Sequence, residues 1–404
     1  MNTMSHSRGR TPRVLTAVGW TVVAALLTAC GVSPLSPGQA PAGKPSSPGA
    51  QSSNRATPML PPQAALHGQF VGLGRNGQAW STTKTDKQVL LRTACGWQNI
   101  TLPVAPAAGD SVAVNGDTIV AVGFQAGNMV VQSSPDLGRT WSTKTVPSAQ
   151  PSAYANVVMS PATGRFVAGA QVMDSLGAGG GSGPGIIGDP SSGMVQAIDV
   201  PGDARDAGWA GNALVAPDNG FGGTGTRLFR SDDFGATWTD LTKAITGADP
   251  PDHDTPLDTP YFGPALTLGD GTAIVLEETT PGSGVSVRVL RFSGDGSHGE
   301  IATLSVPGNV GIGPIPVLAS TYGADGVIVA AFDSPTFQVV TEDGTVSTIS
   351  AAGLPAAPGA MSFQDATNGL AQVTMSSCAN GKTDCTSTTT TYATTDGGHS
   401  WVAV

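Results

Sequence analysis

One eight-residue pattern occurs three times in this chain, as SPDLGRTW at 134–141, SDDFGATW at 231–238 and TTDGGHSW at 394–401. Every copy has Ser or Thr first, Asp third, Gly fifth, Thr or Ser seventh and Trp eighth. Each copy also follows a strand-like run: NMVVQS, TRLFR or TTTTYAT. The pattern therefore predicts a recurring turn between two strands, and with it a fold built from repeats.

The residue types suit a turn. An Asp carboxylate can accept hydrogen bonds from backbone N–H groups of its own loop, and Gly can adopt a positive φ where the chain reverses. The Trp begins the outgoing strand and offers a large apolar face to a neighbouring sheet. The motif resembles the Asp-box, or BNR repeat, S/T-x-D-x-G-x-T/S-W. Its positions here are Ser134, Asp136, Gly138, Thr140, Trp141, Ser231, Asp233, Gly235, Thr237, Trp238, Thr394, Asp396, Gly398, Ser400 and Trp401.

This resemblance implies an all-β fold, a β-propeller. In Asp-box proteins the motif lies on the hairpin between the two outer strands of a blade, away from the ligand face. Asp136, Asp233 and Asp396 are therefore interpreted as structural rather than catalytic. The family includes exo-sialidases, other glycoside hydrolases, sortilin-type receptors and photosystem assembly factors, so the motif indicates a fold and leaves the activity open.

Degenerate copies of the turn fall near Cys95, Asp189, Asp295 and Asp343. The seven turn positions are 41 to 62 residues apart, close to the blade length of four-stranded propellers, about 40–50 residues. Residues 66–404 are therefore predicted to form seven four-stranded blades, with six or eight as alternatives. Inner hairpins are expected at Asn115-Gly116, Asn219-Gly220, 269–271 and Asn368-Gly369. A strand within 67–73 is expected to pair with the first or last blade and seal the ring.

The N-terminal region reads as an export signal. Three arginines precede an uncharged run from Val14 to Ala29, which is short for a membrane-spanning helix. The run ends at Cys30 and resembles a bacterial lipobox, which implies cleavage after residue 29 and lipidation of Cys30. An ordinary signal peptide or an uncleaved anchor is the alternative. Residues 30–65 are rich in Pro, Ser, Ala and Gly and are predicted to be a disordered tether. The expected location is the extracytoplasmic side of a bacterial cell membrane, with the membrane as partner through this lipid.

Charge excludes one class of partner. Three of the 19 basic residues and none of the 29 acidic ones precede Cys30, so cleavage there would leave a net charge of −13. Such a surface repels phosphate backbones, and nucleic-acid binding is not expected.

Cys378 and Cys385 flank a turn-forming segment, ANGKTD. A hairpin that turns at Gly381-Lys382 would place the two cysteines opposite each other, and an oxidising location favours a disulfide between them. Two free thiols are the alternative. Cys95 would then be unpaired, and its role is open.

A search for catalytic groups selects no residue. The resemblance to sialidases would require three arginines around one carboxylate, a Tyr nucleophile with a Glu, and an Asp acid/base; the Phe/Tyr-Arg-Ile-Pro motif common in sialidases is absent. Glu277 and Glu278 could reach a loop near the channel, but a solvated strand end is the favoured interpretation. The acidic loop at 249–258 could hold Ca²⁺, but it lacks the EF-hand order, and the histidines lack metal-ligand spacing. No metal and no cofactor is expected.

The sequence thus predicts an anchored lipoprotein whose propeller is a binding or scaffold module for an unknown protein or glycan. An exo-sialidase-like glycoside hydrolase is the alternative.

Overall fold

The structure of the chain is a computed structural model. It divides into Met1–Thr57 and Pro58–Val404, and only residues of the second unit are described. The described ranges are 70–73, 79–82, 88–93, 96–104, 111–147, 152–173, 179–182, 185–202, 204–218, 227–247, 261–279, 285–306, 317–322, 326–331, 336–363, 365–379 and 384–403. The predicted signal, Cys30, the tether and Cys95 lie outside these ranges, and so the domain boundaries stay a prediction.

The described strands form seven antiparallel sheets that follow one another along the chain. The first sheet contains β1 (Phe70–Leu73), β2 (Ala79–Thr82), β3 (Gln88–Thr93) and β4 (Gly96–Thr101). The second contains β5 (Ser111–Asn115), β6 (Thr118–Gln125), β7 (Asn128–Ser134) and β8 (Ser142–Val146). The third contains β9 (Ser152–Met159), β10 (Phe166–Met173), β12 (Gly185–Asp189) and β13 (Met194–Ile198), and β11 (Gly179–Ser182) also pairs with β10.

The fourth sheet contains β14 (Gly208–Ala210), β15 (Ala213–Pro217), β16 (Leu228–Ser231) and β17 (Thr239–Asp240), and a short helix, α1 (Thr242–Thr246), follows it. In the fifth sheet, β18 (Tyr261–Phe262) and β19 (Leu266–Thr267) both pair with β20 (Ala273–Thr279), and β21 (Val285–Phe292) and β22 (His298–Val306) complete it. The sixth contains β23 (Val317–Tyr322), β24 (Gly326–Ala331), β25 (Thr336–Thr341) and β26 (Val346–Ser350). The seventh contains β27 (Ala360–Phe363), β28 (Gly369–Ala379), β29 (Asp384–Thr394) and β30 (Val402–Ala403).

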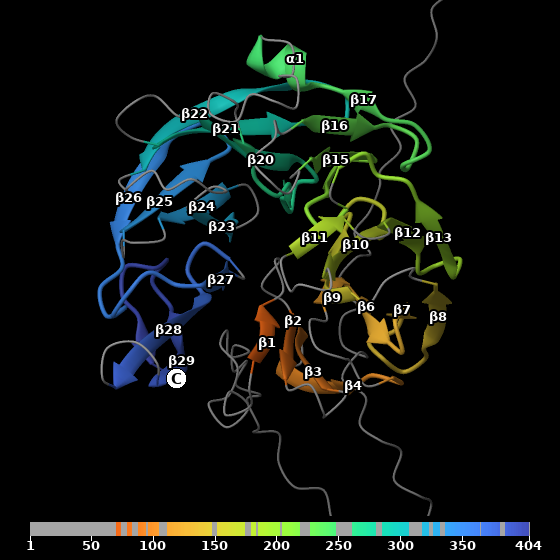
Figure 1. Cartoon of the computed structure of the whole chain (residues 1–404), viewed down its shortest axis with the longest axis horizontal. Coiled ribbons are helices and arrows are strands. Elements are labelled where there is room, and N and C mark those ends of the chain that lie inside the picture. Colours follow the sequence, from red (N-terminus) through yellow and green to blue (C-terminus); the bar gives the residue numbers. More distant parts are fainter. Residues whose placement is uncertain are drawn as a thin grey trace, which may run out of the picture. The chain divides into compact units, whose positions relative to one another are not determined.

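The second unit is a β-propeller. Figure 1 shows its sheets arranged around a common centre in sequence order, with the first strands β1, β23 and β27 on the inside of their sheets. Six of the seven turns predicted from the sequence lie among the described residues, and each joins the third strand of a sheet to the fourth. Three predicted inner turns also join first and second strands, at Asn115-Gly116, at 269–271 and at Asn368-Gly369, whereas Asn219-Gly220 lies outside the described residues.

The predicted sealing strand is β1, which pairs with β2 of the first sheet. The last sheet ends with β30 paired to β29, so no described strand is shared between the first and last sheets. Instead β1 contacts β27 across the junction.

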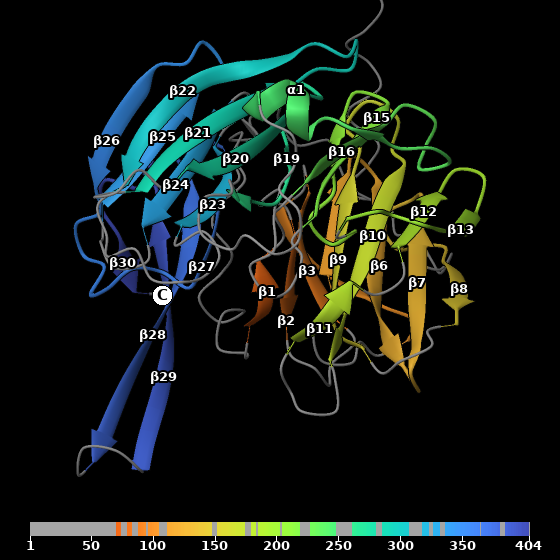
Figure 2. The ribbon, with the colours of Figure 1, turned by 45° about the horizontal axis from the view of Figure 1, so that its top comes forward.

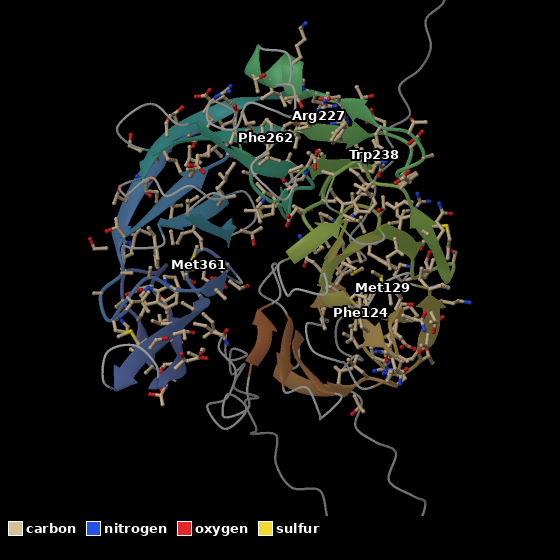
Figure 3. The ribbon with its side chains drawn as sticks, in the orientation of Figure 1. Phe124, Met129, Arg227, Trp238, Phe262 and Met361 are labelled. Atoms are coloured by element: carbon tan, nitrogen blue, oxygen red, sulfur yellow. The ribbon has the colours of Figure 1, made fainter. Side chains whose placement is uncertain are left out.

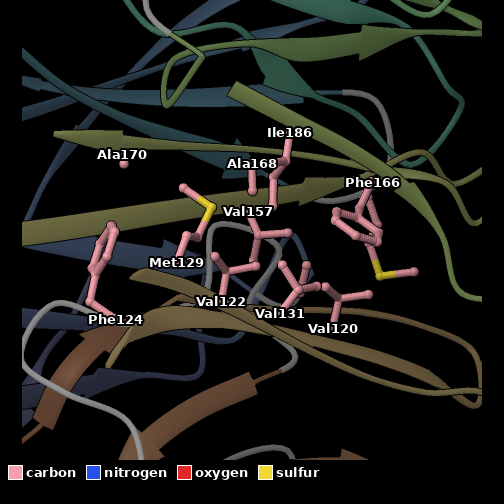
Figure 4. Packing of buried hydrophobic residues seen from close by; sticks show 12 residues of the cluster. Val120, Val122, Phe124, Met129, Val131, Val157, Phe166, Ala168, Ala170 and Ile186 are labelled. Atoms are coloured by element: carbon pink, nitrogen blue, oxygen red, sulfur yellow. The ribbon is translucent and has the colours of Figure 1, made fainter. Parts of the chain in front are cut away.

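The core lies between neighbouring sheets. In β6 the alternating residues Ile119 and Ala121 pack toward the first sheet, while Val120, Val122 and Phe124 pack toward the third. Figure 4 shows the second of these layers, and Figure 3 shows Phe124 and Met129 within it. Because both faces of a central strand are covered, its sequence is an almost continuous apolar run rather than an alternating one.

Candidate functional site

The three copies of the sequence pattern form nearly identical loops, here called the box loops (134–141, 231–238 and 394–401). In the first, the Ser134 hydroxyl accepts a hydrogen bond from the Gly138 N–H (2.7 Å) and donates one to Asp136 Oδ1 (2.9 Å). The N–H of Thr140 donates to Asp136 Oδ1 (2.8 Å), and its hydroxyl donates to Oδ2 (2.7 Å). Asp136 therefore holds both ends of the turn through one carboxylate.

The other two box loops repeat this pattern. Asp233 accepts from the N–H (2.8 Å) and the hydroxyl (2.7 Å) of Thr237, and Asp396 accepts from both groups of Ser400. The fifth-position glycines have φ of 80°, 84° and 92°, as the turn requires. Leu137 and Phe234, one residue earlier, also have positive φ (56° and 60°). Sequence reasoning missed this strain, because neither residue type signals it.

The box carboxylates are ionised at neutral pH. The N–H and hydroxyl of Thr140 hold the pKa of Asp136 below its ordinary value. The hydroxyl of Ser400, and then its N–H, lower the pKa of Asp396 to about 2. In each box loop both carboxylate oxygens accept hydrogen bonds from Ser or Thr of the same loop, so these groups are bound as parts of a turn.

The tryptophans of the box loops differ. The indole N–H of Trp141 donates to the Gly138 carbonyl (3.0 Å), and that of Trp401 to the Gly398 carbonyl (2.8 Å). The indole nitrogen of Trp238 is buried without a hydrogen-bond partner. Trp401 also packs edge-on between Phe337 and Phe363, with ring centroids about 6 Å away in each case. The ring of Trp401 therefore packs the seventh sheet against the sixth.

Glu277 and Glu278 correct the expectation of a solvated strand end. They are 1% and 4% exposed and lie within β20. A neighbouring sheet covers each face of β20. The apolar run that precedes the two glutamates did not show that this cover extends to them. Successive residues of a strand point to opposite faces, so the two carboxyl groups cannot act together on one substrate.

Glu277 belongs to an ion-pair network. Its Oε2 lies 2.7 Å from Arg288 Nη1, and Arg288 Nε lies 2.8 Å from Glu300 Oε2. Burial raises the pKa of Glu277, and the Arg288 charge opposes that rise. On the other face, Glu278 Oε2 is buried without a hydrogen-bond partner, and burial raises the pKa of this carboxyl.

Other described arginines connect sheets. Arg230 of the fourth sheet donates to the Ser293 and Gly294 carbonyls of the fifth (2.9 and 3.2 Å). Arg291 of the fifth sheet pairs with Glu342 of the sixth (3.2 Å) and with Asp270 (2.9 Å).

Arg165, which precedes β10 of the third sheet, lies 3.9 Å from the ring centroid of Phe234 in the fourth. Arg227 lies at the start of β16, 3.8 Å from Asp240 in the same sheet, and Figure 3 shows it on that sheet, where Trp238 is also labelled. These contacts hold the arginines of the third, fourth and fifth sheets against groups of their own or the next sheet. Among the ion pairs of the described residues, no carboxylate is shared by three arginines.

A small, partly open cavity lies between first strands of four different sheets. Its wall is largely apolar, and two hydroxyl groups contribute to it. The residues that line it include Val112, Val157, Met159, Leu266, Thr267 and Thr321. Such a lining offers few polar partners to a sugar, and the space is far smaller than an ordinary ligand pocket.

The remaining candidates are not tested. The acidic loop at 249–258 lies outside the described ranges. Among the residues within them, no three His, Cys, Asp or Glu side chains gather as a metal site, and no helix is long and apolar enough to cross a membrane. The backbone register pairs Cys378 with Cys385, as predicted. Their side chains are outside the described part, and the disulfide stays a prediction.

Comparisons with protein-family models and with curated proteins find no match. Among solved structures, the chain is similar to a streptogramin B lyase, at 12% identity and a TM-score of 0.43, over 79% of this chain and 87% of that one. It is also similar to YCF48 from Cyanidioschyzon merolae, at 13% identity and a TM-score of 0.40, over 72% of this chain and 83% of that one. A third similar structure is the GH93 alpha-L-arabinofuranosidase of Fusarium graminearum, at 12% identity and a TM-score of 0.36, over 65% of this chain and 86% of that one.

Proposed function

We propose that this chain is a lipid-anchored, extracytoplasmic binding module, whose propeller binds a protein or glycan ligand. The lipobox at Cys30 supports the anchor, and the acidic charge disfavours nucleic acid. The observation that carries the binding role is that the described arginines make contacts within and between the sheets. Arg288, Arg291 and Arg230 are held by groups of their own or the next sheet, so they stiffen the ring.

The ligand face is proposed at the end of the sheets opposite the box loops. In an antiparallel four-stranded sheet, the first and third connections lie at one end and the second connection at the other. The box loops are third connections, and the Ser, Thr and Asp groups of their motif already bind one another within the turn. The second connections and the links between sheets therefore form the free face, where a rigid scaffold usually presents its binding loops.

The test immobilises the purified protein and measures binding to a glycan array and to detergent-solubilised membrane proteins. Gln125→Arg changes an exposed residue at the second connection of the second sheet, and Arg139→Glu changes an exposed residue of the first box loop. We expect that Gln125→Arg lowers the affinity for the ligand and that Arg139→Glu leaves this affinity unchanged. The reverse result would place the ligand at the box loops and contradict the proposal.

The anchor has its own test. Cys30→Ala should abolish metabolic labelling by fatty acid and release or stall the chain. An unmodified Cys30 inside an intact N-terminus, found by mass spectrometry, would overturn this part of the proposal.

A further inference from the structure

The seventh sheet contains a hairpin whose outer half pairs only with itself. β28 and β29 remain in register out to Ala379 and Asp384. β27 pairs with β28 only as far as Gln372, and β30 pairs with β29 only at Tyr392 and Ala393. Figure 2 shows the two strands running out well beyond the other strands of their sheet. Among the described strands, β29 therefore has an open backbone edge from residue 384 to residue 391.

Beyond Asp384 at its end, this edge carries no protecting residue. Residues 374–377 and 386–389 are exposed, and Met375 retains 51% of its accessible surface. The stretches 373–379 and 385–391 contain no charged residue and no proline. Open edges are ordinarily protected by charges, prolines or bulges, because their free N–H and C=O groups pair readily with another strand.

We propose that this edge pairs with the same edge of a second copy of the chain, antiparallel, with Thr388 on the twofold axis. Thr386 would then lie opposite the partner's Thr390, and Ser387 opposite the partner's Thr389. All positions from 386 to 391 carry Ser or Thr, so this segment is complementary to itself in an antiparallel pair. The result is a four-stranded sheet shared by two copies.

The hairpin already contains such pairs. The hydroxyls of Thr374 and Thr389 are 2.8 Å apart, and so are those of Ser376 and Ser387. Cross-strand Thr pairs of this kind stabilise antiparallel sheets. The shared sheet would extend the same ladder by two strands.

A second copy fits this edge better than a strand from another protein. Recognition by strand addition takes its affinity from the backbone and its specificity from pockets for alternate side chains. The outer part of the hairpin is exposed on its described residues, and nothing there forms a pocket. The contact is also limited to one strand from each copy, less than a stable interface needs. We expect a weak dimer whose population rises with concentration, independent of the proposed ligand role.

The experiment is sedimentation velocity of the full chain in detergent over a range of concentrations, with charge-swapped variants. Thr388→Lys and Thr388→Glu each place two like charges at the axis, which should weaken self-association at least about tenfold. An equimolar mixture of the two variants should restore the dimer. Met375→Lys is the matched control: Met375 is exposed and lies opposite Thr388 in register, but it is on the strand away from the axis, and its dimer should persist.

Several outcomes would overturn the proposal. A wild-type chain that stays monomeric at every concentration would leave the edge to a different partner. Dimers that Thr388→Lys does not weaken, or that Met375→Lys weakens equally, would place the contact elsewhere. A mixture of Thr388→Lys and Thr388→Glu that stays monomeric would exclude the axis at this residue.

Discussion

Arg288→Ala tests whether the buried carboxylate on β20 depends on its ion pair. Glu277 is 1% exposed and its carboxylate lies 2.7 Å from the guanidinium, so the variant leaves a buried charge without a partner. Breaking a buried pair in this way costs about 3–5 kcal/mol. An unfolding entropy of about 2.1 cal/mol/K per residue gives about 0.7 kcal/mol/K for a propeller of roughly 340 residues, so Tm should fall by about 4–7 °C.

Calorimetry of three variants separates the cost of a buried unpaired charge from the cost of lost side-chain packing. The double variant Glu277→Gln/Arg288→Ala leaves no buried unpaired charge, since Glu300, the other partner of Arg288, is 39% exposed, and it should recover more than half of the loss. Arg291→Ala is the matched control, because Asp270 and Glu342 keep much of their exposure (28% and 45%), and exposed pairs contribute about 0–1 kcal/mol. Equal melting temperatures for Arg288→Ala and the double variant would refute this reasoning, since the loss would then come from packing.

Three further predictions follow from the buried and paired groups. Burial raises the pKa of Glu278 above its ordinary value of 4.5, so the folded protein loses stability as pH rises through the raised pKa. Glu278→Gln should therefore raise Tm at neutral pH, and this gain should disappear toward pH 4.5. Ser231→Ala removes the acceptor of the Gly235 N–H, at about 1–3 kcal/mol for a buried donor, and calorimetry that finds no loss would contradict the box-loop account. A non-reducing peptide map should link Cys378 to Cys385, and a link from either to Cys95 would refute the pairing.

The fold could be predicted because its information is local. Each box loop closes with hydrogen bonds between residues two and four positions apart, such as Ser134 with Asp136 and Asp136 with Thr140. Those residue types and spacings are visible in the sequence. Even the degenerate turn at Asp343 is closed by Thr341 and Thr345.

What the sequence could not supply depends on distant partners. The ion pair of Glu277 with Arg288, and of Arg291 with Glu342, requires knowing which strands and sheets are adjacent. The burial of Glu278 requires knowing that a neighbouring sheet covers that face. β28 and β29 extend beyond their sheet because β27 and β30 are shorter. The residues of β28 and β29 alone do not show where those neighbouring strands end.

The proposed binding role is tested most directly by assaying the purified protein for turnover of sialyl-lactose and a panel of aryl glycosides. We predict no hydrolysis above that of buffer, with the wild type and Glu278→Gln indistinguishable, because Glu277 and Glu278 are buried between sheets and Arg230, Arg288 and Arg291 bind groups of their own or the next sheet. Hydrolysis that disappears in Glu278→Gln, or on replacing a described arginine in a variant that still folds, would show an enzyme and contradict the account.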